Sequence, residues 1–291
     1  MIEGIENYRK AGSIARKVKD YAKSIIKKGT PLIEIAEKIE NRIISLGGKP
    51  AFPVNLSING VAAHYTPGYK DETLAFGLLK IDFGVNVEGY IVDTAFSLDL
   101  ENDEENKKLI LASEKALENV MKKIKEGIEI CEIGKVVQET ITSFNFSPVR
   151  NLSGHEIRRY NLHAGITIPN YDNNNKNKIY EGVYAIEPFS TNGVGEVYES
   201  KPSGIYMLKE KKVTRIGREI LNYIWQEYKT LPFCERWLIK KFGEKVALNL
   251  KFLEQQGILY QFSQLREKKK GKVAQTEHTI LVAKEKTEIL T

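Results

Sequence analysis

The sequence has few cysteines, no long apolar run and no N-terminal segment that resembles a leader. Cys131 and Cys234 are the two cysteines among 291 residues, which excludes a disulfide framework and favours a reducing compartment. No apolar stretch approaches the roughly 18 residues that a membrane-spanning helix requires. The first residues, MIEGIENYRKAGSIARKV, are charged and helix-like, so we expect neither a signal peptide nor a transit peptide. These absences predict a cytoplasmic protein without a membrane partner.

Positive charge is concentrated in one part of an otherwise ordinary globular composition. The whole chain carries a net charge of +6, whereas residues 201–272 contain 17 Lys or Arg against 7 Asp or Glu, a local net of +10. The rest of the chain therefore has an excess of acids. A basic module of this kind can face nucleic acid or a ribosome, or it can be only a solvated surface.

Two segments of the chain repeat one pattern. KKGTPLIEIAEKI at 27–39 aligns with KEGIEICEIGKVV at 125–137, so that Gly29 matches Gly127. Each copy follows an amphipathic helix, expected at 5–28 and 104–124, and precedes strand-like segments. In the first copy we expect Thr30 to cap the second helix, with Pro31 at its first position. The repeat predicts an α+β fold built from two related halves.

The pattern breaks near residue 208. Three helical stretches, TRIGREILNYIWQEYKT, CERWLIKKFG and LNLKFLEQQG, precede a segment that reads as a short hairpin. We interpret residues 208–265 as an inserted winged-helix-like subdomain. Residues 1–207 with 266–291 then form the main domain, because the strand expected at Val273–Val282 resembles the earlier half.

Acids and histidines occur inside segments that otherwise look like buried strands. An unpaired charge in a sheet core costs several kcal/mol, so these positions need a common explanation. A shared divalent cation would neutralise several of them at once. The members of the set are His64, Asp82, Asp93, His155, His163, Glu187, Glu277 and His278.

Asp82 and Asp93 belong to one predicted hairpin, KIDFGVNVEGYIVDTAF. With a tight turn near Val87-Glu88, we expect the two carboxylates directly opposite each other, with Cβ atoms roughly 5 Å apart. Anions this close repel each other unless a metal lies between them. Four acids and an imidazole exceed the needs of one tetrahedral zinc, and they suit two divalent ions about 3.5–4 Å apart that share carboxylates.

Five segments together resemble the type II methionine aminopeptidases, which have the pita-bread (creatinase/aminopeptidase) fold. They are AAHYTP, KIDFGVNVEGYIVDTAF, GHEIRRYNLHAG, AIEPF and AQTEHTIL, in the order of that family. The resemblance covers essentially the whole chain and is closest to the short archaeal form. It implies release of the N-terminal methionine from nascent proteins and peptides, preferably before a small second residue.

The resemblance also implies roles for individual residues. It gives the metal ligands as Asp82, Asp93, His155, Glu187 and Glu277. These would hold two divalent ions, drawn from Co, Mn, Fe, Zn and Ni. His64 and His163 match the catalytic histidines that bind the peptide, and Glu187 would also shuttle a proton. His278 follows a ligand and receives no role.

A methionine side chain needs an apolar pocket. By motif position Phe52, Leu162 and Phe189 match the substrate pocket of the family. Ile205, followed by Tyr206, lies where other members carry a histidine. With Ile205 at the matching place, the polar contact that the histidine makes in other members has no counterpart at this position.

Two other functions fit parts of the sequence. An X-Pro aminopeptidase or prolidase shares the fold and the metal ligands, but usually carries a separate domain ahead of the catalytic one. A non-catalytic RNA- or ribosome-binding relative would use the basic insert, although it has no reason to retain five ligands. The hydrolase could itself dock on the ribosome through that insert. By analogy with the family we expect a monomer.

Overall fold

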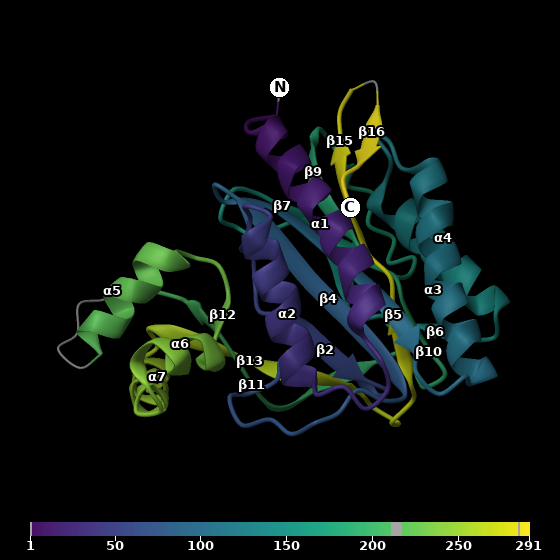
Figure 1. Ribbon diagram of the computed structural model, residues 1–291. Coiled ribbons are helices and arrows are strands. Elements are labelled where there is room, and N and C mark those ends of the chain that lie inside the picture. The colour runs from purple at the N-terminus through teal and green to yellow at the C-terminus, as the bar shows by residue number, and fades with distance from the viewer. Residues whose placement is uncertain (1, 211–216, 285) are drawn as a thin grey trace.

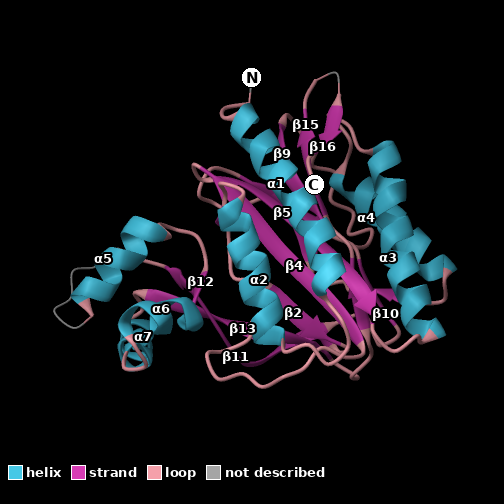
Figure 2. Ribbon diagram, in the orientation of Figure 1, coloured by secondary structure: helices cyan, strands magenta, loops and turns pink. Residues whose placement is uncertain are grey.

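Helices lie over small β-sheets in this protein (Figures 1 and 2). The computed structural model describes residues 2–210, 217–284 and 286–291. The helices are α1 (Ile5–Ile25), α2 (Leu32–Ser45), α3 (Glu104–Lys123), α4 (Ile130–Ser143), α5 (Arg218–Glu227), α6 (Glu235–Phe242) and α7 (Val246–Gln255). Among the helices of these residues, none is long and apolar enough to cross a membrane.

The strands form four sheet systems within the described residues. In the first, β4 (Leu78–Val87) pairs with β1 (Lys49–Pro50), β2 (Asn55–Ile58) and β5 (Tyr90–Asp99). The second has the order β14 (Val273–Gln275), β10 (Phe189–Thr191), β6 (Ser147–Pro148). The third has the order β12 (Phe233–Cys234), β11 (Val197–Leu208), β13 (Leu259–Glu267), β3 (Val61–Ala63). The fourth has the order β16 (Thr287–Ile289), β15 (His278–Val282), β9 (Gly182–Ile186), β7 (Ser153–Ile157), β8 (Thr167–Pro169).

The two helix pairs confirm the α+β halves predicted from the repeat. Gly29 and Gly127 occupy the same place in the two interhelical turns, with φ angles of 84° and 83°. The amide of Gly29 donates to the carbonyl of Ala75 at 2.8 Å, and that of Gly127 donates to Ile179 at 2.7 Å. Each turn is therefore tied to a later segment of its own half in the same way.

The expected cap of α2 is different in the structure. The helix begins at Leu32, with Pro31 at the N-cap and without a side-chain cap. The backbone of Thr30 instead pairs with the segment before β4, because its carbonyl accepts from Ala75 at 2.8 Å. Pairing with that segment holds Thr30 outside the helix.

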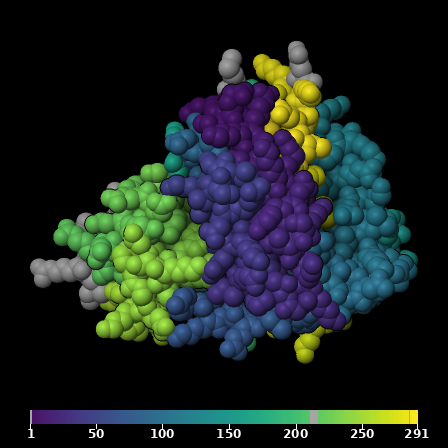
Figure 3. Space-filling view, in the orientation of Figure 1, coloured from purple at the N-terminus to yellow at the C-terminus, as the bar shows by residue number. Residues whose placement is uncertain are grey.

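Packing of α1 and α2 determines which face of β4 is free. Ile81, Phe83 and Val85 are fully buried in a cluster that also contains the apolar faces of α1 and α2. Since side chains alternate along a strand, Asp82 and Gly84 face the other way. The space-filling view shows α1 and α2 covering the side that faces the viewer (Figure 3).

The β4–β5 hairpin confirms the expected strands but not their register. Val87 pairs with Tyr90, and the two-residue turn consists of Glu88 and Gly89, both with positive φ, at 55° and 86°. Asp82 therefore lies opposite Ala95. The two aspartates share one face of the hairpin as diagonal neighbours. The prediction that they lie directly opposite each other is therefore wrong.

Helices α5–α7 form a lobe at one side of the body (Figures 1 and 3). Their apolar side chains pack in a cluster of their own, which includes Ile224, Leu238 and Leu250. Residues 211–216 of the predicted insert lie outside the described residues. The strand after these helices forms no local hairpin, because β13 pairs with β11 and with β3. This pairing connects the lobe to the body.

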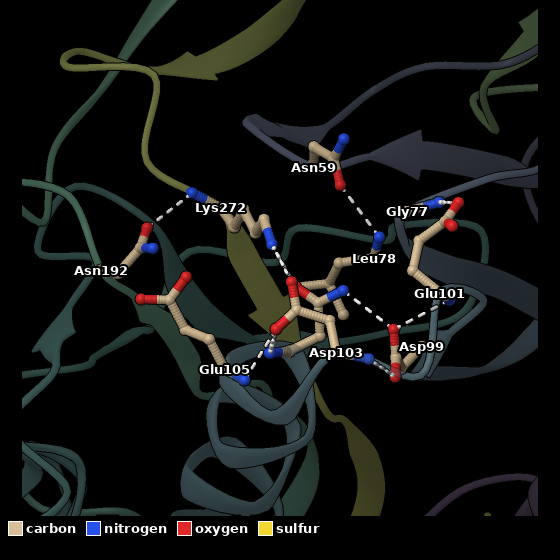
Figure 4. A network of polar contacts seen from close by, with 10 residues as sticks. Asn59, Gly77, Leu78, Asp99, Glu101, Asp103, Glu105, Asn192 and Lys272 are labelled. Carbon is tan, nitrogen blue, oxygen red and sulfur yellow. Dashed lines mark hydrogen bonds and ion pairs between the residues drawn. The ribbon is translucent and has the colours of Figure 1, made fainter.

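A polar network fixes the segment that leads into β14 (Figure 4). The ammonium of Lys272 donates to Asp103 and to Asn106, both at 2.8 Å, and its amide donates to Asn192 at 2.7 Å. Asp103 also caps α3, and Asn106 donates to Asp99 at the end of β5 at 2.8 Å. The network therefore ties β5, α3 and the start of β14 together.

Candidate active site

A cavity of about 400 Å³ lies on the face of β4 that is turned away from the helices. Its walls come from both halves of the body and from the lobe. Of the residues singled out in the sequence, those that line it are Phe52, His64, Asp82, Asp93, His155, Leu162, His163, Glu187, Phe189, Ile205 and Glu277. His278 lies outside this lining, with its Nδ1 3.2 Å from the hydroxyl of Thr291.

The five predicted ligands come from separate elements that meet at the centre. Asp82 is on β4, Asp93 on β5 and His155 on β7, whereas Glu187 and Glu277 flank β9 and β15. In the β9–β15 ladder Ile186 pairs with His278, and in the β10–β14 ladder Phe189 pairs with Gln275. The same register continues between the two ladders, so Glu187 lies across from Glu277.

Three of these residues have ligand atoms that lie within 4.8 Å of one another: Asp93, His155 and Glu277. The Nε2 of His155 is 3.7 Å from Oδ2 of Asp93 and 3.6 Å from Oε1 of Glu187. All three side chains of the trio are buried, with exposed fractions of 5%, 5% and 1%. The cluster therefore combines several anions and an imidazole away from bulk water.

Burial and mutual repulsion oppose ionisation of the four carboxyl groups. Burial raises the pKa of Asp82 to about 7, despite hydrogen bonds from Gln275 and Asp93. Burial, followed by the charge of Asp82, raises the pKa of Asp93 and of Glu187 well above the usual range. The pKa of Glu277 rises through burial and then through Asp93 and Glu187. None of the described residues lining the cavity is a lysine or an arginine. The charge of Lys19, which lies outside the lining, opposes the rise in the pKa of Glu277 only in part.

The donor set fits a divalent metal. Oδ1 of Asp82, Oδ1 of Asp93 and Oε1 of Glu277 are buried without a hydrogen-bond partner. A buried oxygen without a partner costs free energy, and coordination to a cation would satisfy it. Carboxylates with an imidazole suit borderline ions such as Mn, Fe, Co and Zn. Burial lowers the pKa of His155 to about 3, so its imidazole is neutral and free to coordinate.

His64 is held in an unusual conformation at the edge of the cavity. It directly follows β3 and has φ of 61°, in the left-handed region that a non-glycine residue rarely occupies. Its Nδ1 is 3.1 Å from the carbonyl of Ser263, so Nδ1 carries the proton and Nε2 presents a lone pair. Burial lowers the pKa of His64, and the Ser263 carbonyl partly opposes this shift. His64 is therefore a neutral hydrogen-bond acceptor at Nε2.

His163 lies against the acid cluster. Its ring meets that of His155 edge to face, with centroids 4.4 Å apart. Burial by surrounding protein atoms, followed by the repulsion that a protonated His64 would exert, lowers the pKa of His163 to about 4. A neutral His163 can donate one N–H to a substrate oxygen beside the cluster.

Apolar side chains form the wall next to the acids. Phe52, Leu162 and Ile205 are almost completely buried and line the cavity. Tyr206, the neighbour of Ile205, instead packs in the lobe cluster, and its hydroxyl accepts from Gln261 at 2.8 Å. The wall fits an apolar side chain.

Several lining residues were not found from the sequence. Gln275 is 1% exposed, and its amide nitrogen lies 3.5 Å from Glu187 and 3.4 Å from Glu277. It precedes Glu277 by two residues, so strand alternation was a signal that could have found it. Pro232 and Phe262 come from around the lobe helices and had no local signal.

Comparison with known proteins shows which family the chain belongs to. The model of the metallopeptidase family M24 matches residues 6–284. A methionine aminopeptidase of Thermococcus onnurineus is 49% identical, with 97% of each chain covered. Another, from Pyrococcus abyssi, is 47% identical, with 99% of each chain covered.

Solved structures show the same fold at lower identity. A thermophilic Arx1 superimposes with a TM-score of 0.85 at 16% identity, covering 100% of this chain and 91% of that one. A methionine aminopeptidase of Thermotoga maritima superimposes with a TM-score of 0.72 at 22% identity, covering 100% of this chain and 97% of that one. These likenesses confirm the pita-bread fold that the motifs predicted. The chain therefore belongs to the metallopeptidase family M24, among its methionine aminopeptidases.

Proposed function

We propose that this cavity releases the N-terminal methionine from peptides and nascent chains with the help of two divalent ions. One observation supports this most: buried carboxylate oxygens without partners lie beside an apolar wall and two neutral imidazoles. Hydrolysis of nascent chains would place the activity in the cytoplasm. The preference for a small second residue rests on the type II resemblance.

The ligand assignment is the one that the family resemblance implies, and the clustering of Asp93, His155 and Glu277 supports it. Asp93 and Glu277, at the centre of the cluster, would be shared between the two ions. Asp82 would bind one ion, and His155 with Glu187 would complete the other. When bound, such ions act as Lewis acids and lower the pKa of a water molecule toward neutrality. The carboxylate set accepts Mn, Fe, Co, Ni and Zn alike.

Glu187 is the candidate for proton transfer. Its side chain is 13% exposed and lines the cavity, so it can reach a water molecule and the substrate. It would take a proton from the attacking water and give it to the leaving amine. His155, 3.6 Å from its Oε1, limits where this carboxylate can lie.

The two histidines would bind the scissile peptide group from different sides. His163 would donate to the carbonyl oxygen, whose negative charge grows in the transition state. His64, an acceptor at Nε2, would receive the N–H of a substrate amide. The methionine side chain would contact Phe52, Leu162, Phe189 and Ile205.

A comparison of peptides tests this function. We expect metal-dependent release of methionine from Met-Ala-Ser, and no release from N-acetyl-Met-Ala-Ser. Cleavage of Ala-Pro at an equal rate would favour an X-Pro peptidase. No cleavage with any of the five metals would favour a non-catalytic relative.

Ribosome docking through the basic insert is a separate proposal. The high local charge of residues 201–272 supports it, although several of these cations are already paired in the structure. Arg236 pairs with Glu40 at 2.8 Å and Lys272 pairs with Asp103 at 2.8 Å. Salt-dependent co-sedimentation with ribosomes would support docking, and its absence at low salt would refute it. Light scattering in the same buffers tests the expected monomer.

A further inference from the structure

Strand β5, which carries Asp93, and the segment around Glu277 before β15 meet without a regular ladder. Among the described strands, β5 pairs with β4 alone and is the edge of its sheet. One backbone hydrogen bond crosses to the other half at this point, from the amide of Glu277 to the carbonyl of Ala95 at 2.9 Å. The outward backbone groups of an edge strand need other partners.

Side-chain hydroxyls provide those partners. The hydroxyl of Thr279 accepts from the amide of Asp93 at 2.6 Å and donates to the carbonyl of Asp93 at 2.8 Å. In the reverse direction, the hydroxyl of Thr94 donates to the carbonyl of Glu277 at 3.1 Å. Thr94 follows Asp93 in the sequence and binds the backbone of Glu277. Thr279 comes two residues after Glu277 and binds the backbone of Asp93.

Both threonines are themselves held firmly. Thr94 and Thr279 are fully buried. Thr279 faces Ala185 in the ladder between β15 and β9, and its amide donates to the hydroxyl of Thr291 at 3.0 Å. A displacement of either threonine would therefore disturb a sheet and not only a side chain.

We propose that the hydroxyls of Thr94 and Thr279 are positioning groups that set the separation of the Asp93 and Glu277 carboxylates, and with it the affinity for divalent metal. This inference rests on the ligand roles proposed above for the two acids. The carboxylates repel each other across the junction, and the reciprocal hydrogen bonds oppose their separation. Groups that orient metal ligands typically change metal affinity 10–100-fold when removed.

The test measures metal binding by the full-length protein. The metal-free protein is titrated with Mn²⁺ or Co²⁺ in a calorimeter, and the visible spectrum of the Co²⁺ form is recorded. Thr279→Val keeps the shape of the side chain and removes the hydroxyl, and we expect its affinity to fall about 10–100-fold. Thr279→Ser restores the hydroxyl and should return the affinity to within about threefold of the wild-type protein.

The matched control is Thr191→Val. Thr191 is also fully buried, donates to the carbonyl of Lys272 at 2.7 Å and accepts from the amide of Gly193 at 2.9 Å. Its replacement should lower the unfolding temperature without changing the metal affinity or the Co²⁺ spectrum. A merely structural role for Thr279 would give the same result as this control.

Each outcome decides between the hypotheses. If Thr279→Val does not fold, Thr94→Val removes the reciprocal bond, and a weaker affinity is expected there as well. Wild-type affinity in every folded variant at these two positions would overturn the positioning role. A wild-type protein that binds neither ion would instead overturn the proposed function.

Discussion

Arg236 on α6 and Glu40 on α2 form a buried bidentate ion pair between the lobe and the body. The two guanidinium nitrogens donate to the two carboxylate oxygens at 2.9 and 2.8 Å, and the indole of Trp237 donates to the same carboxylate at 2.9 Å. Arg236 is 1% exposed and Glu40 is 5% exposed. The pair therefore fixes the lobe, and Pro232, in the segment between α5 and α6, lines the cavity.

Replacement of Glu40 should loosen the lobe. Glu40→Gln leaves the buried Arg236 charge with only the longer contact to Glu37 at 3.9 Å, so we expect a loss of about 3 kcal/mol in the free energy of unfolding. KM for Met-Ala-Ser should rise more than kcat falls, because the apolar wall moves while the acid cluster stays. Chemical denaturation and steady-state kinetics measure the two effects.

Lys70 and Glu244 provide a matched control for this prediction. They also join the body to the lobe, at 2.9 Å, but both side chains are exposed. Glu244→Gln should leave the unfolding free energy and KM unchanged within error, because exposed ion pairs contribute little. Equal effects of the two substitutions would contradict the role assigned to the buried pair.

Asp93→Asn should separate catalysis from folding. We expect kcat to fall by several orders of magnitude, because the central shared ligand loses its charge. The metal-free variant should unfold at no lower temperature than the wild-type protein, since burial and then repulsion from Asp82 raise the pKa of Asp93 and disfavour a charge at this position. Near-normal activity would refute the two-ion scheme, and Asp20→Asn on the exposed side of α1 serves as the control.

Ile205→Ala should weaken recognition of methionine. The loss of apolar contact predicts a decrease of about 10-fold or more in kcat/KM for Met-Ala-Ser. Tyr198→Ala, an exposed position on the same strand, should leave kcat/KM unchanged. If both variants keep wild-type kcat/KM, Ile205 does not contact the methionine side chain.

Stability should depend on pH through Asp71, in the loop that follows His64. Burial tends to raise the pKa of Asp71, but hydrogen bonds from Thr73 and Tyr65 outweigh it, and the net pKa is lowered. A lowered pKa stabilises the fold above the ordinary carboxyl pKa of about 4, and the stabilisation is lost as the pH falls through the folded-state value.

The measurement for Asp71 is a comparison of unfolding free energies across pH. Asp71→Asn should be less stable than the wild-type protein at neutral pH, and the difference should shrink as the pH falls below about 4. A difference that stays constant with pH would show that the hydrogen bonds do not depend on the charge. Asp20→Asn again provides an exposed control.

Local pattern was sufficient for much of the fold. The repeated turns with Gly29 and Gly127 predicted two similar halves, because a chain reversal after a helix favours glycine at positive φ. The two apolar runs around Asp82 and Asp93 predicted the hairpin that carries both aspartates. Acids and histidines inside otherwise apolar segments then predicted the members of the site.

Pairing between distant segments was not predictable in the same way. The turn at Glu88-Gly89 shifted the hairpin register, because Glu88 adopts positive φ without being a typical residue for it. β13 was expected in a local hairpin, yet it pairs with β11 and β3. Such pairings depend on which edges are free in three dimensions.

The sequence by itself determined the kinds of groups in the site and the elements that carry them, since residue type and strand alternation are local properties. Only the tertiary structure decided the distances between these groups and the residues that hold them in place. It placed Glu187 across from Glu277, brought Phe262 of β13 to the cavity, and set Thr279 against the backbone of Asp93. These relationships join residues far apart in the chain, and they arise because the buried backbone and carboxylate groups of one half find their partners in the other.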